Sequence, residues 1–232
     1  MQPWLEIARA RAPDGTELRL DRRGDEWVVR CDGRVLMSTR QHGSEEALAL
    51  LAFAQAPHAQ DVFVGGLGLG FTARAALEKL PREGRLLIAE FTPEIVEWNR
   101  QHVGEFARRP LDDPRTRLHV GDAVAHLLRA HELYDALLLD IDNGPSALVH
   151  ASNEALYGDK GVAACFAALR PGGVLTVWSA SGDDGYLMRL ERAGFMARAE
   201  FAGARAGSGR GVRHVIFVAV RPRAQSSKAR TR

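Results

Sequence analysis

Short segments of alternating apolar and polar residues fill the first 40 positions of the chain. Such alternation predicts β-strands that each turn one face towards a core. Asp14-Gly15 and Asp32-Gly33 separate some of these segments, and Asp-Gly between strand-like runs indicates a hairpin turn. Residues 1–40 therefore predict a small antiparallel unit, with strands expected at 5–9, 17–21, 26–31 and 34–38.

Apolar runs and helical patterns alternate after residue 40. The first predicted helix is 44–54, with Ser44 as its N-cap and Glu45 in its first turn. The predicted strands that follow are 61–64, 85–90, 116–120, 134–140 and 174–179. The predicted helices that alternate with them are 72–80, 93–108, 123–130, 154–169 and 185–193. The last two predicted strands, 195–201 and 214–220, have no helix between them, so they are expected to pair antiparallel.

This order of elements predicts an α/β fold with a doubly wound, Rossmann-like sheet. A terminal antiparallel strand pair is the feature that separates a methyltransferase-like sheet from an ordinary dinucleotide-binding sheet. The predicted organisation is an N-terminal β-hairpin unit over 1–40 and a Rossmann-like domain over 41–223. Residues 224–232 form a polar, basic tail that is expected to be disordered.

Composition narrows the class of protein. The chain has 232 residues, 46% of them hydrophobic and 26% charged, which suits one α/β core with a small accessory piece. The net charge of +2, with no basic patch outside the tail, argues against a nucleic-acid partner. The longest apolar run, 47–54, is too short to span a bilayer. Cys31 and Cys165 are interpreted as free thiols in a reducing compartment, with a disulfide as the alternative, so a cytoplasmic protein without a membrane partner is expected.

A glycine-rich loop follows the first strand of the α/β part. Gly66, Gly68 and Gly70 alternate there with leucines and lead into a predicted helix. Glycines allow the backbone to turn tightly and to approach a ligand closely. The carboxyl end of such a strand is where open α/β sheets bind ligands. The loop is therefore a candidate cofactor site, with a plain strand-to-helix turn as the alternative.

Acidic residues end the next two strands. Glu90 lies 20 positions after Gly70, where a carboxylate can accept hydrogen bonds from both hydroxyls of a ribose; the alternative is a solvated strand end. Asp122 can accept a hydrogen bond from an adenine amino group, and the backbone N–H of Ala123 can meet a ring nitrogen. The alternative for Asp122 is an N-cap of the helix that follows, and both roles are compatible.

Two further acids, Asp140 and Asp142, close the apolar strand 134–140. Carboxylates at the mouth of a sheet can bind a cationic amine and remove its proton. Asp140 is the preferred candidate, and a solvated loop acid is the alternative for Asp142. Trp178 is interpreted as a core residue, with the lining of an acceptor pocket as the alternative. Neither cysteine lies near a histidine with metal-ligand spacing, so no metal is expected.

Taken together, these segments resemble the spermidine synthase (polyamine aminopropyltransferase) family. The segments that carry the resemblance are 62–70, Ala89-Glu90, Asp112-Asp113-Pro114-Arg115, Gly121-Asp122-Ala123, Tyr134-Asp135 with Asp140, Leu156-Tyr157 and 169–173. The resemblance implies that the 41–223 domain binds S-adenosylmethionine or its decarboxylated form as co-substrate. It also implies a polyamine-type acceptor, a homodimer, and Glu90, Asp122 and Asp140 as the ribose, adenine and catalytic-base residues.

The chain departs from the family in three places. Gly68 stands where the family has an aspartate that meets the amino group of the aminopropyl donor. The segment after Asp140 is shorter than in the family. A Gln/Tyr-containing stretch that shapes the diamine site is echoed by Gln41-His42-Gly43. Two alternatives to aminopropyl transfer therefore stay open: a small-molecule methyltransferase and a non-catalytic nucleoside-binding homologue.

Overall fold

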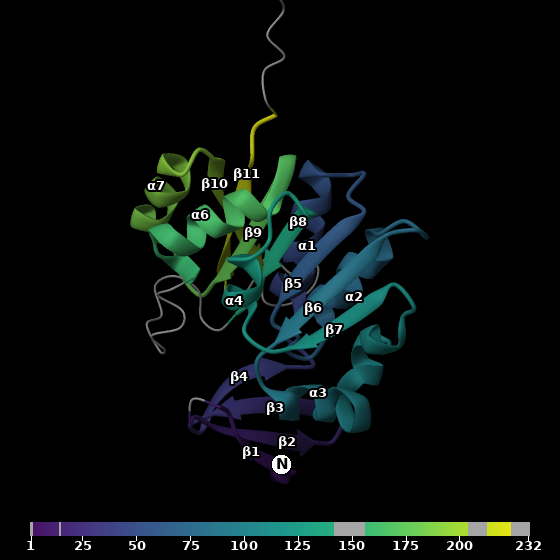
Figure 1. Ribbon diagram of the computed structural model, residues 1–232. Helices are drawn as coiled ribbons and strands as arrows, with labels where there is room; N and C mark the ends of the chain where they lie inside the picture. The colour runs from purple at the N-terminus through teal and green to yellow at the C-terminus, as the bar shows by residue number, and fades with distance from the viewer. Residues whose placement is uncertain (1, 14, 142–155, 204–212, 224–232) are drawn as a thin grey trace, which may run out of the picture.

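Two sheets form the framework of the protein (Figure 1). The computed structural model describes residues 2–13, 15–141, 156–203 and 213–223. The first sheet is antiparallel with the order β1-β2-β3-β4. Its strands are Leu5–Arg11, Glu17–Arg23, Glu26–Cys31 and Arg34–Ser38, as the alternating pattern predicts to within two residues.

The second sheet has seven strands in the order β10-β11-β9-β8-β5-β6-β7. These strands are β5 (Asp61–Gly65), β6 (Arg85–Glu90), β7 (Thr116–Val120), β8 (Tyr134–Leu139), β9 (Leu169–Ser179), β10 (Met196–Gly203) and β11 (Arg213–Val220). Strands β5 to β9 pair in parallel, whereas β11 is antiparallel to both β9 and β10. The predicted methyltransferase-like sheet and its terminal antiparallel pair are confirmed.

Helices cover both faces of this sheet. They are α1 (Gly43–Gln55), α2 (Phe71–Lys79), α3 (Pro93–Trp98), α4 (Ala123–Leu127), α6 (Asp159–Ala168) and α7 (Asp184–Arg192). The first three share one hydrophobic cluster with the small sheet, and the last three share the other. Strand β5 shows the alternation that this requires, because Val62 and Val64 join the first cluster and Phe63 joins the second. None of the helices within the described ranges has both the length and the apolar character that a bilayer span needs.

The predicted helix 93–108 is wrong in its second half. After α3 the chain continues as a π-helical turn, Asn99–Val103, and then as a 3₁₀ turn, Gly104–Ala107. The Asn99 amide donates to the Gly68 carbonyl oxygen at 2.7 Å and to the Ile95 carbonyl oxygen at 3.0 Å. A π turn re-aims a side chain that a regular helix would place elsewhere. Here it accompanies a direct hydrogen bond from the helix to the glycine-rich loop.

Other helix boundaries also differ from the prediction, and α4 ends at Leu127 instead of residue 130. His42, not Ser44, precedes α1, and the Ser44 hydroxyl donates to the Glu45 carboxylate at 2.6 Å instead of capping the helix. The helix predicted over 154–169 ends at Ala168, because Leu169 already belongs to β9, which starts five residues before the predicted strand 174–179. Gly172 donates from its backbone N–H to the Arg221 carbonyl oxygen, which extends the pairing of β9 beyond the predicted strand.

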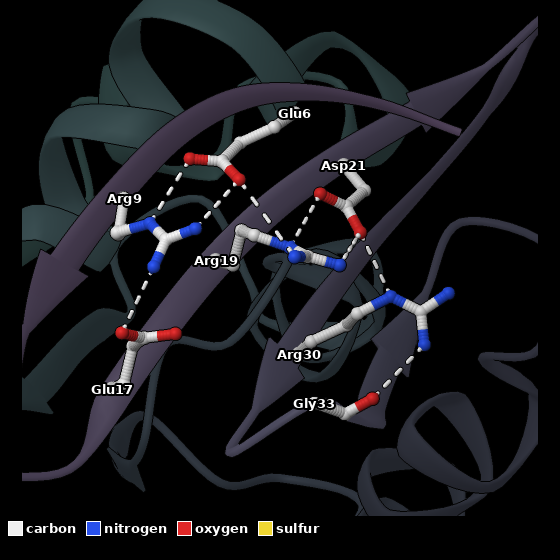
Figure 2. Close-up of polar contacts among 7 residues, drawn as sticks. All are labelled: Glu6, Arg9, Glu17, Arg19, Asp21, Arg30 and Gly33. Carbon is white, nitrogen blue, oxygen red and sulfur yellow. Dashed lines mark hydrogen bonds and ion pairs between the residues drawn. The ribbon is translucent and has the colours of Figure 1, made fainter. Parts of the chain in front are cut away.

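A ladder of charged side chains crosses the small sheet (Figure 2). Asp21 is 1% exposed and lies between two guanidinium groups. Arg19 Nε is 2.9 Å from Asp21 Oδ1, and Arg30 Nε is 2.8 Å from Asp21 Oδ2. Glu6 and Glu17 extend the ladder through Arg9 at the exposed end. The buried carboxylate is therefore compensated by cations from its own strand and from β3.

We expect Asp21→Ala to lower the free energy of unfolding by about 1–3 kcal/mol, because it leaves two partly buried arginines without their counter-ion. The matched control is Glu17→Ala, since Glu17 and its partner Arg9 are 44% and 50% exposed. Exposed pairs contribute about 0–1 kcal/mol. Urea denaturation measures both variants, and equal losses would contradict the special position of Asp21.

Candidate active site

A cavity of about 270 Å³ opens at the carboxyl edge of the large sheet. It is lined by the loop after β5, by the ends of β6 and β8, and by the start of α4. The small sheet closes the opposite side with apolar side chains and one thiol: Leu18, Cys31, Leu36 and Met37. Sequence reasoning does not identify this wall, because a strand pattern cannot say against which distant loop the strand packs.

The glycine-rich loop lies against both β8 and the small sheet. Gly66 has φ +90°, and a Cβ at this residue would overlap the carbonyl oxygen of Asp140. Gly68 has φ +52°, and a Cβ there would lie 3.2 Å from Met37 Sδ. Both residues line the cavity. Gly70 differs, because its Cβ position faces Pro110 and Ala107 rather than the cavity, and it precedes the first residue of α2.

Glu90 holds the glycine-rich loop in place. The carboxylate is 8% exposed, and its Oε2 accepts from the Leu67 backbone N–H at 2.8 Å. Its Oε1 accepts from the Thr92 backbone N–H, also at 2.8 Å. A carboxylate oxygen can accept more than one hydrogen bond, so these contacts with the backbone are compatible with a ligand contact in the cavity. Glu90 is thus a buried part of the cavity wall rather than a solvated strand end.

Asp122 lines the neighbouring part of the cavity with Ala123. Its Oδ1 accepts from the Val124 backbone N–H at 2.8 Å, so the N-cap interpretation is confirmed. The Asp122 side chain is exposed, and its second oxygen has no cap role in this geometry. Capping and ligand contact therefore remain compatible.

Asp140 follows β8 at the end of the cavity nearest to α1 and α2. Its Oδ2 accepts from the Thr72 hydroxyl at 2.6 Å, and its backbone N–H donates to the Gly65 carbonyl oxygen at 2.8 Å. These two contacts fix the carboxylate beside the glycine-rich loop. Asp142, the second predicted catalytic residue, lies outside the described residues.

Glu45 is a cavity residue that sequence reasoning assigns only to the first turn of a helix. Burial, and then the nearby charge of Asp140, raise the pKa of the Glu45 carboxyl to about 8. The helical pattern gives no signal for this role, because the proximity of Glu45 to Asp140 depends on how α1 packs across β8. The structure thus brings two carboxyl groups to one end of the cavity, with Trp178 from β9 beside them.

The Asp-Asp-Pro-Arg segment, residues 112–115, has a structural role away from the cavity. The Arg115 guanidinium donates to both carboxylate oxygens of Asp113, at 2.9 and 2.7 Å, and to the Leu80 carbonyl oxygen at 2.7 Å. This bidentate pair fixes the chain as it enters β7. The pKa of Asp113 is lowered by its hydrogen bond to Arg115. Within the described ranges, no group of three His, Cys, Asp or Glu residues is arranged to hold a metal ion.

The raised pKa of Glu45 makes stability depend on pH. Folding favours the protonated form of the Glu45 carboxyl. The contribution of Glu45 to the free energy of unfolding is therefore fully present below the ordinary pKa of 4.5 and is lost as the pH rises through about 8. We expect Glu45→Gln, measured against the wild type by urea denaturation, to gain roughly 1–3 kcal/mol between pH 5 and pH 9. Glu97→Gln, at an exposed position of α3, is the control. A constant difference between Glu45→Gln and wild type would contradict the raised pKa.

Comparisons with known proteins point to one family. The spermine/spermidine synthase domain model matches residues 41–182. Polyamine aminopropyltransferase 2 of Pseudomonas aeruginosa is 34% identical over 122 residues, which cover 51% of this chain and 33% of that protein. The polyamine aminopropyltransferase of Nitrosomonas europaea is 30% identical over 154 residues, which cover 65% of this chain and 45% of that protein. The chain thus matches between a third and a half of the length of these curated relatives.

Solved structures show the same fold. A spermidine synthase in complex with the transition state analogue AdoDATO gives a TM-score of 0.78 at 17% identity, covering 94% of this chain and 74% of that chain. Spermidine synthase from Thermotoga maritima gives a TM-score of 0.76 at 18% identity, with the same coverage. At such low identity these likenesses show the fold alone. The domain match over residues 41–182, together with the shared fold, shows that the chain belongs to the spermine/spermidine synthase family.

Proposed function

We propose that this protein is a transferase that moves an aminopropyl group from decarboxylated S-adenosylmethionine to a polyamine-type amine. The observation that carries the proposal is one continuous cavity, in a member of this family, that joins Glu90 and Asp122 to Asp140. The first two carboxylates suit the hydroxyls and amino group of an adenosine. The third suits a cationic amine.

The chemistry asks little of the protein beyond alignment and one proton transfer. The sulfonium donor is already activated. The amine nitrogen forms a bond to the aminopropyl carbon that is attached to sulfur, while the bond between that carbon and sulfur breaks. The electron pair stays on sulfur, and methylthioadenosine leaves. An amine is mostly protonated at neutral pH and must lose a proton before it attacks. Asp140, held by Thr72 at the acceptor end, attracts the cation and accepts that proton.

The nucleoside half of the proposal uses the other end of the cavity. Gly66 and Gly68 allow the backbone to approach the donor, Glu90 accepts from the ribose, and Asp122 accepts from the adenine amino group. The backbone N–H of Ala123 meets a ring nitrogen. Gly70 lies outside the cavity lining, and a Cβ at this residue would meet Pro110 and Ala107 instead of the donor.

Methyl transfer from S-adenosylmethionine is the second candidate, and Gly68 is the observation that favours it. No side chain extends from this position, and Met37 occupies the adjoining space. The loop therefore offers no carboxylate to the amino group of an aminopropyl donor. The two functions differ in the donor they consume, so an assay with both donors separates them. A chain that binds methylthioadenosine but consumes neither donor would be a non-catalytic homologue.

The quaternary structure and location belong to the same proposal. A homodimer is assembled through the N-terminal strands, because residues 1–40 are too few for an independent core. Leu5 and Val35, on the outer strands of the small sheet, are 63% and 53% exposed. Light scattering that gives the mass of one chain at high concentration would contradict the dimer. Cys31 and Cys165 are not joined in a disulfide, which supports a reducing, cytoplasmic location that fractionation would test.

We expect Glu90→Gln to weaken methylthioadenosine binding by about 1–3 kcal/mol, the scale of lost charge-assisted hydrogen bonds. Gln keeps the shape of the side chain but replaces one acceptor oxygen with an NH₂ donor. This donor would face the N–H of Leu67 or Thr92, which is itself a donor. Calorimetry measures the affinity, and Asp112→Asn, at an exposed acid outside the cavity, is the control. Unchanged affinity in Glu90→Gln would restrict Glu90 to its role in the loop.

We expect Asp140→Asn to lower the transfer rate by about 10²–10⁴-fold and to leave methylthioadenosine affinity nearly unchanged. Asn keeps an oxygen that accepts from Thr72, so the loss reports the missing charge and base. The assay offers decarboxylated S-adenosylmethionine or S-adenosylmethionine, with putrescine or spermidine as acceptor. Full activity in the variant would place the base elsewhere, and no transfer by the wild type with any acceptor would overturn aminopropyl transfer.

A further inference from the structure

A second group of polar side chains adjoins the acceptor end of the cavity. Ser44 is fully buried at the start of α1, and its hydroxyl donates to Glu45 Oε2 at 2.6 Å. On its other side, Ser44 Oγ is 2.9 Å from Nδ1 of His214 on β11. These contacts form a continuous series from a cavity carboxyl to a partly exposed imidazole.

The series begins beside the proposed base. Thr72 connects Asp140 to the start of α1. Its hydroxyl donates to Asp140 at 2.6 Å and lies 3.3 Å from the Glu45 carbonyl oxygen. The charge of Asp140 is close enough to raise the pKa of Glu45, after the larger effect of burial. Two carboxylates so placed favour sharing one proton.

The series ends at a histidine that can exchange protons. Burial lowers the pKa of His214, which keeps the ring neutral and one nitrogen free to accept a proton at neutral pH. The ring of Trp178 packs against it at 4.6 Å between centroids and holds its orientation. Glu46 on the same helix, which pairs with His42 at 2.9 Å, also raises the pKa of Glu45, and Glu90 lines another part of the same cavity.

We propose that Glu45, Ser44 and His214 form the path by which the proton accepted by Asp140 leaves the acceptor end of the cavity. The inference rests on the proposed function for the origin of that proton. Glu45, which is protonated at neutral pH, passes its proton to Ser44 Oγ while the Ser44 hydroxyl proton moves to His214 Nδ1, and Asp140 then gives the proton it took from the amine to the Glu45 carboxylate. The imidazolium then releases its Nε2 proton to solvent. No bond to carbon changes and Asp140 is ionised again, and the neutral ring returns to the Nε2–H tautomer by proton exchange with solvent before the next turnover.

This path makes the tautomer of His214 depend on the protonation of Glu45. When Glu45 is protonated, it donates to Ser44, Ser44 donates to Nδ1, and the neutral ring carries its proton on Nε2. When Glu45 is ionised, it accepts from Ser44, Ser44 accepts from Nδ1–H, and the proton lies on Nδ1. A purely structural hydrogen bond between Ser44 and His214 would keep one tautomer throughout.

The decisive experiment is ¹⁵N NMR of the histidine rings in the full chain, which needs no activity. In the wild type and in the control Glu97→Gln, we expect His214 to change from the Nε2–H to the Nδ1–H tautomer between about pH 7 and pH 9, around the Glu45 pKa of about 8. In Glu45→Gln and in Ser44→Ala, the change should be absent. A single tautomer in the wild type across this range would overturn the path.

Turnover gives the second measurement. With saturating donor and putrescine, we expect His214→Ala to be slowed at least about tenfold at pH 7 and to be restored by added imidazole. His102→Ala, which removes a ring stacked on Trp27 away from the cavity, should keep the wild-type rate. A slowed His214→Ala that imidazole does not restore would overturn the path. A wild type without aminopropyl transfer would instead overturn the proposed function, while the tautomer measurement still decides whether the path exists.

Discussion

The close approach of Gly66 to the Asp140 backbone is the constraint on which the site depends. The Gly66 backbone N–H donates to the Ala89 carbonyl oxygen at 2.8 Å, and the Asp140 N–H donates to the Gly65 carbonyl oxygen at 2.8 Å. The ends of β8, β5 and β6 are thereby fixed side by side at the point where the strand order reverses. Open α/β sheets leave a crevice at such a point. A side chain at residue 66 would force β8 away, and the carboxylate of Asp140 would move with it.

The loop that starts at Gly66 is held from three directions. Glu90 accepts from its Leu67 amide, Asn99 donates to its Gly68 carbonyl oxygen, and Met37 of the small sheet lies over Gly68. The π turn after α3 is part of this arrangement, since it accompanies the hydrogen bond from Asn99. A loop preorganised in this way loses little conformational entropy when a ligand binds. The small sheet, which lies below the large sheet in Figure 1, therefore also contributes lining residues to the cavity.

Charge is distributed unevenly around the cavity. The end proposed for the nucleoside has Glu90, whose oxygens accept from backbone amides, and the end proposed for the acceptor has Asp140 with Glu45. Two carboxyls at one end repel each other when both are ionised, which favours the state in which Glu45 keeps its proton. This coupling relates the pH dependence of stability to the proton chemistry of the proposed reaction. Both depend on the packing of α1 across β8.

Local sequence patterns determined much of the architecture. Alternation predicted the four N-terminal strands, and the order of strands and helices predicted the parallel sheet with its antiparallel end. These features depend on side-chain periodicity and on turn residues such as Gly and Pro, which act over a few positions. The acids at strand ends were found for the same reason, because the carboxyl ends of parallel strands meet at one edge. Glu90, Asp122 and Asp140 therefore line one cavity, as the sequence predicted.

Tertiary structure alone decided which residues from distant segments join that cavity. Glu45 and Ser44 appeared as the start of a helix, and His214 as part of a last strand. Their contacts span 170 positions and depend on how α1 packs against β11. Asn99 likewise required a helix irregularity that propensity does not predict. Gly70 belongs to the glycine-rich loop, but a Cβ at this residue would meet Pro110 instead of the cavity. The reason is that the chain turns into α2 at this point. A local pattern specifies an element and its buried face, whereas the neighbours of that face are set by the global packing of the chain.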